Sequence, residues 1–523
     1  MSRELSGDTV VDKAEPQVQQ HNKNLHGQRE KRILCSIVTV RILLGTLLSI
    51  LAFATLQRQW PHRSDRLEKA QQCTTKHLRK HLNILDHAEP ISKSEFLHRR
   101  DRLAAALYQS GIDAFVVEPG YTFQYYANVS QSDWEPWEPE ERPFVMVVRP
   151  LMTNEGLHAR TMFLAPSFEV GRARMLGIPA ESELHIVPWE EHEDPFTVFR
   201  NEMFGGHNAT VMIDEEMRDY ISRGIQDAGL RTVGLSSAVE EVRQIKSPAE
   251  IEILRAVNSM TVEGIRALQR CIETGMRERD LITILDYAMQ AIGFQNFFNI
   301  VLFDENAALP HGGFATGDKR LAKNTMILID VGYHYLGYSS DVCRSFFISR
   351  FKSHWSVSTW YGSLINEYWP PSWRETGYPT SSPHEKTKEK NLALSAARKD
   401  VEEKIRVWNI VFDAQTAAAK AFKPNNSCAD VDIAARTVID DAGYNGTFTH
   451  RLGHGIGIKA HESPYLNKAN KKTFLKPGMT FTNEPGIYLE GKFGARHEDI
   501  YLVTEDGEAE LLSGKRATSP FEP

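Results

Sequence analysis

The amino-acid sequence predicts an α/β protein in two folded parts, preceded by a membrane-spanning helix. Three observations lead to this class: a long apolar run near the N-terminus, an alternation of helix-like and strand-like segments that starts near residue 91, and a second such series that starts at Ser247. The chain has 523 residues, of which 41% are hydrophobic and 25% charged. These figures exclude a wholly disordered chain and a small disulfide-rich scaffold. The net charge of −7 gives no reason to expect a nucleic-acid partner.

The N-terminal segment is expected to anchor the chain in a membrane. Residues 1–32 are polar and predict a cytoplasmic tail, whereas residues 33–56 are almost wholly apolar apart from Arg41. A membrane-spanning helix needs about 20 such residues; a buried helix or a cleavable signal fits this stretch less well. Four glycosylation sequons favour a lumenal or extracellular body, and they begin at Asn128, Asn208, Asn425 and Asn445. The expected location is therefore that of a single-pass membrane protein.

Composition and periodicity divide the rest of the chain into a stalk and two domains. The charged residues 57–90 predict the stalk, and residues 91–235 predict a first α/β domain. The second domain is predicted over residues 240–515, because a capping box with proline at the first helical position opens it. Residues 351–400 are rich in tryptophan, serine and proline and predict an insertion, since so long a loop is unusual inside a compact domain.

Two aspartates of the second domain are placed to share a cation. A hairpin with its turn centred between Tyr335 and Leu336 would put Asp330 opposite Asp341. Opposed residues have Cβ atoms roughly 4.5–5.5 Å apart, and two like charges there are destabilising. A cation between them would reverse that penalty. The alternative, two solvated aspartates on a sheet surface, fits poorly with the apolar residues around Asp330.

A second pair of carboxylates repeats this pattern nearer the C-terminus. Glu484 and Glu498 are equidistant from Gly491 in a glycine-rich turn, although a β-bulge would shift the pairing. Residues 450–464 lie between the two hairpins and contain three histidines, and glycines on both sides of His454 let a ligand approach closely. The five candidate metal ligands are Asp330, Asp341, His454, Glu484 and Glu498.

This set of four carboxylates and one imidazole fits two divalent ions. Hydrolytic centres of this kind hold their metals about 3.5–4 Å apart and share bridging carboxylates. Oxygen-rich ligation with one histidine and no thiolate favours manganese and permits cobalt, iron or zinc. In such a centre the shared water is the nucleophile, and one carboxylate can move its proton.

The same motifs resemble those of the pita-bread metallopeptidases, which include Xaa-Pro dipeptidases, aminopeptidase P and methionine aminopeptidases. The likeness covers about residues 91–523, including a creatinase-like N-terminal domain. It is carried by residues 306–312, 330–344, 450–464, 483–486 and 496–499. The run His-Arg-Leu-Gly-His-Gly-Ile-Gly at 450–457 is most similar to the proline-specific branch. The resemblance implies an α/β chain whose catalytic domain has the pseudo-twofold pita-bread fold, a proline-containing peptide as substrate and hydrolysis of the Xaa-Pro bond, and it allows a homodimer.

The resemblance also implies a metal role for each of the five ligands. Asp330 would chelate one ion, and Asp341 and Glu498 would bridge both. His454 and Glu484 would complete the other ion. Glu484 would also be the catalytic general base.

Four more residues resemble substrate-binding groups of the family. His311 and His461 would bind substrate and stabilise the reaction intermediate as catalytic residues. His450 would line the pocket. Arg496 would pair with the substrate's carboxylate or belong to the metal-bridging network.

Some features depart from the family pattern or leave alternatives open. Cys343 stands where the family usually has a small hydroxyl residue and His497 where it usually has an aliphatic one, and both could alter metal preference or rate. The cysteines outside the apolar run show no metal or disulfide spacing. Two other functions compete: a same-fold C–N hydrolase with a non-peptide substrate, and a binding protein that kept the fold. The complete ligand set argues against both. Dipeptidase and aminopeptidase action are equally compatible with these residues.

Overall fold

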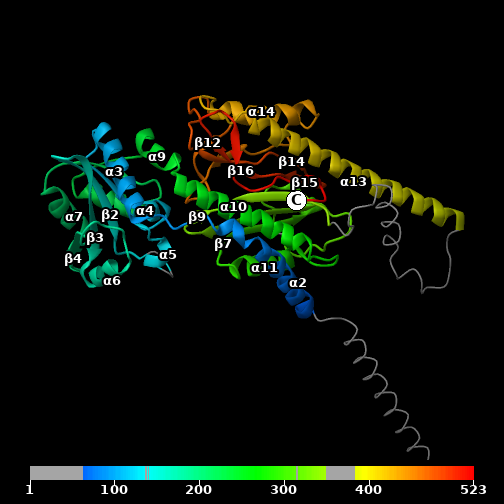
Figure 1. Cartoon of the computed structure of the whole chain (residues 1–523), viewed down its shortest axis with the longest axis horizontal. Coiled ribbons are helices and arrows are strands. Elements are labelled where there is room, and N and C mark those ends of the chain that lie inside the picture. The colour runs from blue at the N-terminus through cyan, green and yellow to red at the C-terminus, as the bar shows by residue number, and fades with distance from the viewer. Residues whose placement is uncertain (1–62, 136–137, 139, 314–315, 349–382) are drawn as a thin grey trace, which may run out of the picture. The chain divides into compact units, whose positions relative to one another are not determined.

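The computed structural model describes residues 63–135, 138, 140–313, 316–348 and 383–523 (Figure 1). The chain divides into two compact units, residues 1–68 and 69–523. Every element discussed below belongs to the second unit, except the first turns of helix α2 (Arg63–Leu78). The predicted tail and most of the predicted insertion lie outside the described residues.

No helix in the described part of the chain is long and apolar enough to cross a membrane. The two longest helices, α10 (Pro248–Gln269) and α13 (Pro383–Ala419), carry charged side chains along their length, and such charges are costly in a bilayer. The membrane-spanning helix expected over residues 33–56 falls outside the described residues. The fold class is therefore corrected to a mixed α/β protein, and the transmembrane helix, the membrane association and the lumenal or extracellular location are withdrawn.

The N-terminal part is a six-stranded mixed sheet in the order β4-β3-β2-β1-β5-β6. Its strands are β1 (Ala114–Val117), β2 (Val145–Thr153), β3 (Gly156–Pro166), β4 (Ile186–Trp189), β5 (Thr210–Ile213) and β6 (Arg231–Val233). Phe115 and Val117 of β1 pack into one core, and Ala114 and Val116 pack into another. Because alternate side chains of a strand point to opposite faces, both faces of this sheet are buried.

Helices cover the two faces of that sheet. They are α3 (Lys93–Gln109), α4 (Tyr121–Ala127), α5 (Gln131–Trp134), α6 (Val170–Met175), α7 (Pro195–Phe204), α8 (Asp219–Asp227) and α9 (Ser237–Gln244). Leu103 and Leu107 of α3 pack with Phe115, whereas Phe199 of α7 and Ile221 of α8 pack into the opposite core. The N-terminal part is thus a helix–sheet–helix sandwich.

The C-terminal part consists of two halves that repeat one plan, a helix pair followed by antiparallel strands. The first half has α10, α11 (Glu278–Gln290), β7 (Gln295–Phe303), β8 (Ile327–Tyr335), β9 (Tyr338–Ser339) and β10 (Val342–Phe346). The second has α13, α14 (Cys428–Asp441), β11 (Gly453–Gly455), β12 (Glu462–Leu466), β13 (Thr480–Asn483), β14 (Gly486–Leu489), β15 (Phe493–Arg496), β16 (Asp499–Val503) and β17 (Ala509–Leu511). In Figure 1 the pair α13–α14 lies on the other side of these strands from α10–α11.

The second helix of each pair begins with the same cap. The Asp280 carboxylate accepts from the backbone N–H of Arg277 at 2.9 Å, and the Asp430 carboxylate accepts from that of Ser427 at 2.8 Å. A carboxylate at this position satisfies a free N–H and favours the positive end of the helix dipole. Residues 383–400 of the predicted insertion form the start of α13.

Part of the predicted stalk is helical and covalently tied to the C-terminal part. Residues 63–85 form α2 and the 3₁₀ helix η1 (Arg79–Leu85). Cys73 of α2 forms a disulfide with Cys271, which follows α10, and 198 positions separate the two cysteines along the chain. This disulfide was not predicted from the sequence, because two cysteines so far apart along the chain form no recognisable spacing motif.

A buried polar triad joins the N-terminal part to the β8–β9 hairpin. Arg99 of α3 donates to the Tyr338 hydroxyl at 2.8 Å, and that hydroxyl donates to Glu250 of α10 at 3.0 Å. The Arg99 and Glu250 side chains are each 1% exposed. Tyr338 lies three residues before Asp341, so the triad supports the hairpin that carries both candidate aspartates.

Candidate metal centre

The first hairpin brings the two aspartates to one face in a register different from the predicted one. Asp330 pairs with Cys343, and Val331 pairs with Val342. The turn is centred between Leu336 and Gly337, which both have positive φ, as a two-residue hairpin turn requires. The predicted pairing of Asp330 with Asp341 is therefore wrong. Asp341 lies two residues from the partner of Asp330, and since a step of two preserves the face of a strand, the two carboxylates still meet.

The second hairpin is centred on Gly491. Gly486 pairs with Arg496 in the β14–β15 ladder, and Asn483 pairs with Asp499 in the β13–β16 ladder. Both ladders keep the same register. Glu484 and Glu498 occupy the junction between them, equidistant from Gly491, where the strands change partners.

Carboxylate and imidazole atoms from both hairpins and from β11 converge in three overlapping groups. In each group the candidate ligand atoms lie within 4.8 Å of one another. The groups are Asp330, Asp341 and Glu498; His454, Glu484 and Glu498; and Asp341, His454 and His461. The first two contain all five ligands expected from the sequence and share Glu498. The third adds His461, whose side chain is 56% exposed.

His454 is oriented by its strand and by one backbone acceptor. Its Nδ1 donates to the Gly455 carbonyl at 3.1 Å, which leaves Nε2 pointing toward Glu484 Oε1 at 3.3 Å and Asp341 Oδ2 at 3.6 Å. Such a hydrogen bond fixes the tautomer and the ring of a metal-binding histidine. The strand can approach this closely because residue 453 is glycine: a Cβ there would lie 2.2 Å from the Thr482 carbonyl oxygen.

The site concentrates negative charge away from water. Burial raises the pKa of Asp341 and of Glu498 well above the ordinary range, and the neighbouring carboxylates add to that rise. Burial also raises the pKa of Asp330, against the opposing charge of Arg496. Glu484 behaves differently: burial acts to raise its pKa, but the hydrogen bond with His454 and the interactions with His450 and Arg496 outweigh burial and lower the pKa to about 2.

These residues fit divalent cations. The Oδ1 atom of Asp330 is buried and has no hydrogen-bond partner among the described residues, although a buried polar atom without a partner is expensive. A cation bound there would satisfy that oxygen and offset the repulsion among the carboxylates. Carboxylates with a single imidazole are also a ligand set suited to manganese and similar ions.

Arg496 belongs to the network around the ligands. It is 1% exposed, and it donates to the Asp330 carboxylate, to the Tyr488 hydroxyl at 2.7 Å and to the Pro310 carbonyl at 3.3 Å. These contacts hold the guanidinium against Asp330, while its buried Nε atom has no partner among the described residues. They leave no exposed surface for a substrate carboxylate.

His450 is linked to Arg496 through a residue that the sequence reasoning missed. The Tyr488 hydroxyl donates to His450 Nε2 at 2.7 Å, while His450 Nδ1 donates to the Arg451 carbonyl at 2.7 Å. Burial lowers the pKa of His450 to about 4, so the ring is neutral near pH 7. The only sequence signal for Tyr488 is its position four residues after Glu484 on the same hairpin arm.

His461 and His311 are exposed, whereas the five candidate ligands are buried or half-buried. His461 Nε2 is 3.6 Å from Asp341 Oδ2, and its ring centroid is 4.3 Å from that of His454. Partial burial and the charge of His454 lower the pKa of His461 to about 4, and the charges of Arg451 and His311 contribute to this shift. His311 is exposed in the loop after η3 (Asp304–Ala308).

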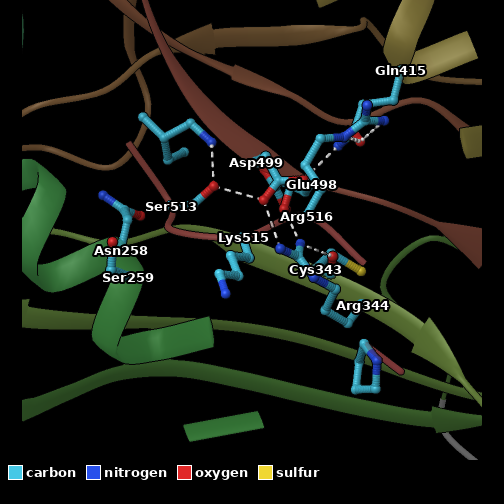
Figure 2. A network of polar contacts seen from close by, with 12 residues as sticks. Asn258, Ser259, Cys343, Arg344, Gln415, Glu498, Asp499, Ser513, Lys515 and Arg516 are labelled. Carbon is cyan, nitrogen blue, oxygen red and sulfur yellow. Dashed lines mark hydrogen bonds and ion pairs between the residues drawn. The ribbon is translucent and has the colours of Figure 1, made fainter. Parts of the chain in front are cut away.

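Behind the ligands, a buried network holds the backbone of Glu498 (Figure 2). Arg344 donates to the Glu498 carbonyl at 2.6 Å and to Asp499 Oδ1 at 2.6 Å. Asp499 also accepts from Ser513 at 2.6 Å and from Gln415 at 3.0 Å. The sequence reasoning named Arg344 and Asp499 only as parts of motifs and missed Ser513 and Gln415, because their convergence depends on the tertiary fold.

The two residues that depart from the family pattern add no ligand atoms to the three groups. The Cys343 thiol is buried and donates weakly to the Arg496 carbonyl at 3.7 Å. The His497 ring is buried against Trp408, with ring centroids 4.5 Å apart. Both therefore pack beside the ligands instead of joining them.

Known proteins share this architecture and its motifs. The profile of metallopeptidase family M24 matches residues 252–359 and 393–505. An uncharacterised peptidase of Schizosaccharomyces pombe is 34% identical over 496 residues, which cover 94% of this chain and 95% of the relative. A Xaa-Pro dipeptidase of Pyrococcus furiosus is 27% identical over 338 residues, which cover 64% of this chain and 81% of that protein.

A solved structure agrees with the fold. The crystal structure of a dipeptidase from Pyrococcus horikoshii is similar with a TM-score of 0.60 and 26% identity, over 80% of this chain and 98% of that one. The similarity supports the pita-bread fold that the motifs imply. Because the likeness to the S. pombe peptidase extends over nearly all of both chains and the family profile spans the segments that carry the ligands, this protein is a member of metallopeptidase family M24.

Proposed function

We propose that this protein is a metal-dependent exopeptidase that hydrolyses Xaa-Pro bonds at a centre of two divalent ions, preferably manganese. The observation that carries the proposal is the meeting of two ligand groups at Glu498. One group adds Asp330 and Asp341 from the first half of the pseudo-repeat, and the other adds His454 and Glu484 from the second half. The named activity of the P. furiosus relative supports the proline specificity. An alternative C–N hydrolase or binding protein has no comparable observation in its favour.

The five ligands divide between the two ions. Asp330 would hold one ion, His454 and Glu484 would hold the other, and Asp341 and Glu498 would contribute to both. When bound, such ions polarise a carbonyl group and lower the pKa of water. The chain supplies the rigid carboxylate geometry, since Arg496 holds Asp330 and Arg344 holds the backbone of Glu498.

Glu484 is suited to move a proton. The pKa of Glu484 lies at about 2, because the hydrogen bond with His454 and the interactions with His450 and Arg496 outweigh the effect of burial, so its carboxylate is ionised near pH 7. It can accept a proton from the nucleophile and return it to the departing nitrogen. The amide nitrogen of proline carries no hydrogen, so a site for Xaa-Pro needs no acceptor for it. His461 and His311, both exposed, would bind substrate and stabilise negative charge on its carbonyl oxygen.

The test compares dipeptides that differ only at the second residue. The purified protein loaded with manganese should cleave Xaa-Pro with a kcat/KM orders of magnitude above that for Xaa-Ala, and elemental analysis should find two ions per chain. Efficient cleavage of Xaa-Ala with Xaa-Pro ignored would overturn the specificity and leave the metal chemistry standing. Fewer than one ion per chain after loading would overturn the dinuclear centre.

Matched variants test the residue roles. Glu484→Gln should abolish turnover, whereas Glu490→Gln, an exposed glutamate on the same hairpin, should leave turnover unchanged. Asp341→Asn should remove a bridging ligand and much of the activity. Undiminished turnover in either site variant would contradict its assignment. Light scattering of the purified protein tests the predicted homodimer.

A further inference from the structure

One further group of possible metal ligands in the described part of the chain shares no residue with the metal centre. Cys73, His77 and Cys271 each offer a ligand atom, and these atoms lie within 4.8 Å of one another. The two cysteines are the partners of the disulfide. His77 follows Cys73 by four residues on α2, and residues four apart share one face of a helix. Two sulfurs and an imidazole therefore meet where α2 reaches the residues that follow α10.

Contacts other than the disulfide hold α2 and η1 in place. Three residues of α2 at spacings of four are buried and form one face of the helix: Ala70, Thr74 and Leu78. The 3₁₀ helix η1 lies against α10, where His81 Nε2 is 3.6 Å from Glu263 Oε2. Because this packing does not depend on the sulfur–sulfur bond, reduction of the disulfide would leave the two cysteines close together.

The three ligand atoms suit zinc. Thiolate sulfur lies about 2.3 Å and imidazole nitrogen about 2.0–2.1 Å from a tetrahedral zinc ion, which puts neighbouring ligand atoms roughly 3.5–3.8 Å apart. Small side-chain rotations would give this spacing in a group whose atoms lie within 4.8 Å. Two thiolates cancel the charge of Zn²⁺, and a water molecule can take the fourth position. Thiolates also select zinc over manganese, the reverse of the preference expected for the carboxylate centre.

We propose that Cys73, Cys271 and His77 bind one zinc ion when the disulfide is reduced. A dithiol reductant would transfer two electrons and two protons to the disulfide, which yields two thiols and the disulfide of the reductant. Zinc binding would then release both thiol protons. All three residues are half-buried, so reductant and ion can reach them. The zinc ion would hold α2 to the end of α10 in place of the covalent bond.

The main test uses Co²⁺, which binds the same kinds of ligand as Zn²⁺ and absorbs in the near ultraviolet when it is bound to thiolate. The full chain is reduced with a phosphine, freed of it in the absence of oxygen, and titrated with Co²⁺. Reduced wild type should show this absorption up to one Co²⁺ per chain, and Zn²⁺ should abolish it. Oxidised wild type should show none. The three ligand groups of the metal centre contain no cysteine, so Co²⁺ bound there does not contribute.

Two histidine variants test the third ligand. His77→Gln keeps both cysteines and should weaken zinc binding by the reduced protein at least about 10-fold, since loss of a residue that only supports a metal ligand already costs about 10- to 100-fold. His87→Gln removes an exposed histidine that follows η1 and should bind zinc as wild type does. Competition with a coloured zinc chelator measures each affinity. Elemental analysis should find one more zinc ion per chain in reduced than in oxidised wild type.

Each result supports or overturns the site. No thiolate absorption in reduced wild type, or equal zinc contents in its reduced and oxidised forms, would overturn it. Equal zinc affinities of His77→Gln and wild type would overturn the set of three ligands. Cys271→Ser should lose the absorption, and retained absorption would assign the ion to another cysteine. Because His77→Gln keeps the disulfide and its melting temperature can be compared in the oxidised form, the test does not depend on the folding of Cys271→Ser. None of these measurements uses peptide cleavage, so their outcome is independent of the proposed function.

Discussion

Replacing Asp499 with asparagine tests whether the network behind the ligands supports the metal centre. The Arg344 and Asp499 side chains form an ion pair at 2.6 Å and are only 1% and 2% exposed. Removing one partner of a buried pair leaves an uncompensated charge, which costs about 3–5 kcal/mol. Asparagine keeps the size of the side chain, but its NH₂ group would face the Gln415 amide, which donates to Asp499 at 3.0 Å. We therefore expect Asp499→Asn to lower the free energy of unfolding by about that range.

The same change should weaken metal binding. Arg344 also holds the Glu498 carbonyl, so loss of its partner frees the backbone of a ligand shared by two groups. Changes in residues that support metal ligands cost about 10- to 100-fold in metal affinity, and we expect a loss in that range.

The assays are urea-induced unfolding of the metal-free protein and titration with manganese. Asp506→Asn is the matched control, because Asp506 is exposed near the end of β16 and should cost less than about 1 kcal/mol. The reasoning is refuted if Asp499→Asn unfolds at the same urea concentration as wild type and binds manganese equally well.

Three further predictions follow from burial and close packing. Burial raises the pKa of the Cys428 thiol to about 12 and that of Cys343 well above its ordinary value, so alkylation of the native protein followed by peptide mapping should find both unlabelled; labelling of either contradicts its burial. Burial lowers the pKa of His450 from 6.5 to about 4, so the unfolded chain binds this proton at a higher pH than the folded chain does. As the pH is lowered from 6.5 to 4, the free energy of unfolding of the wild type, measured by urea titration, should therefore fall relative to that of His450→Gln. A constant difference between the two proteins over this pH range would exclude the effect. Gly453→Ala should separate β11 from β13, cost at least about 1–3 kcal/mol and abolish manganese binding, whereas Gly171→Ala, with nothing within 4 Å of the added carbon, should match wild type in both measurements.

The sequence predicted the second hairpin more accurately than the first. Gly491 marks its turn, and both ladders around it keep one register. In the first hairpin the turn lies one residue later than predicted, because Leu336 adopts a positive φ beside Gly337. Leucine rarely adopts a positive φ, so its presence at residue 336 does not mark the turn. Asp330 and Asp341 nevertheless converge, since the displaced register preserves the face.

Features that depend on distant parts of the chain could not be predicted. The role of Arg496 was left between two options, because only the fold shows that its two terminal NH₂ groups donate to Asp330, Tyr488 and Pro310. The expected membrane-spanning helix rested on the apolarity of one segment, and no described helix supports it.

The disulfide between Cys73 and Cys271 closes a covalent ring that contains the entire six-stranded sheet. A protease that cuts the backbone once inside this ring would open it without dividing the molecule, and the two pieces would separate only after reduction. A cut before Cys73, by contrast, would lie outside this ring, and the disulfide would not join the two pieces. The same bond therefore keeps the N-terminal sheet covalently joined to the catalytic part after any single cleavage within the ring.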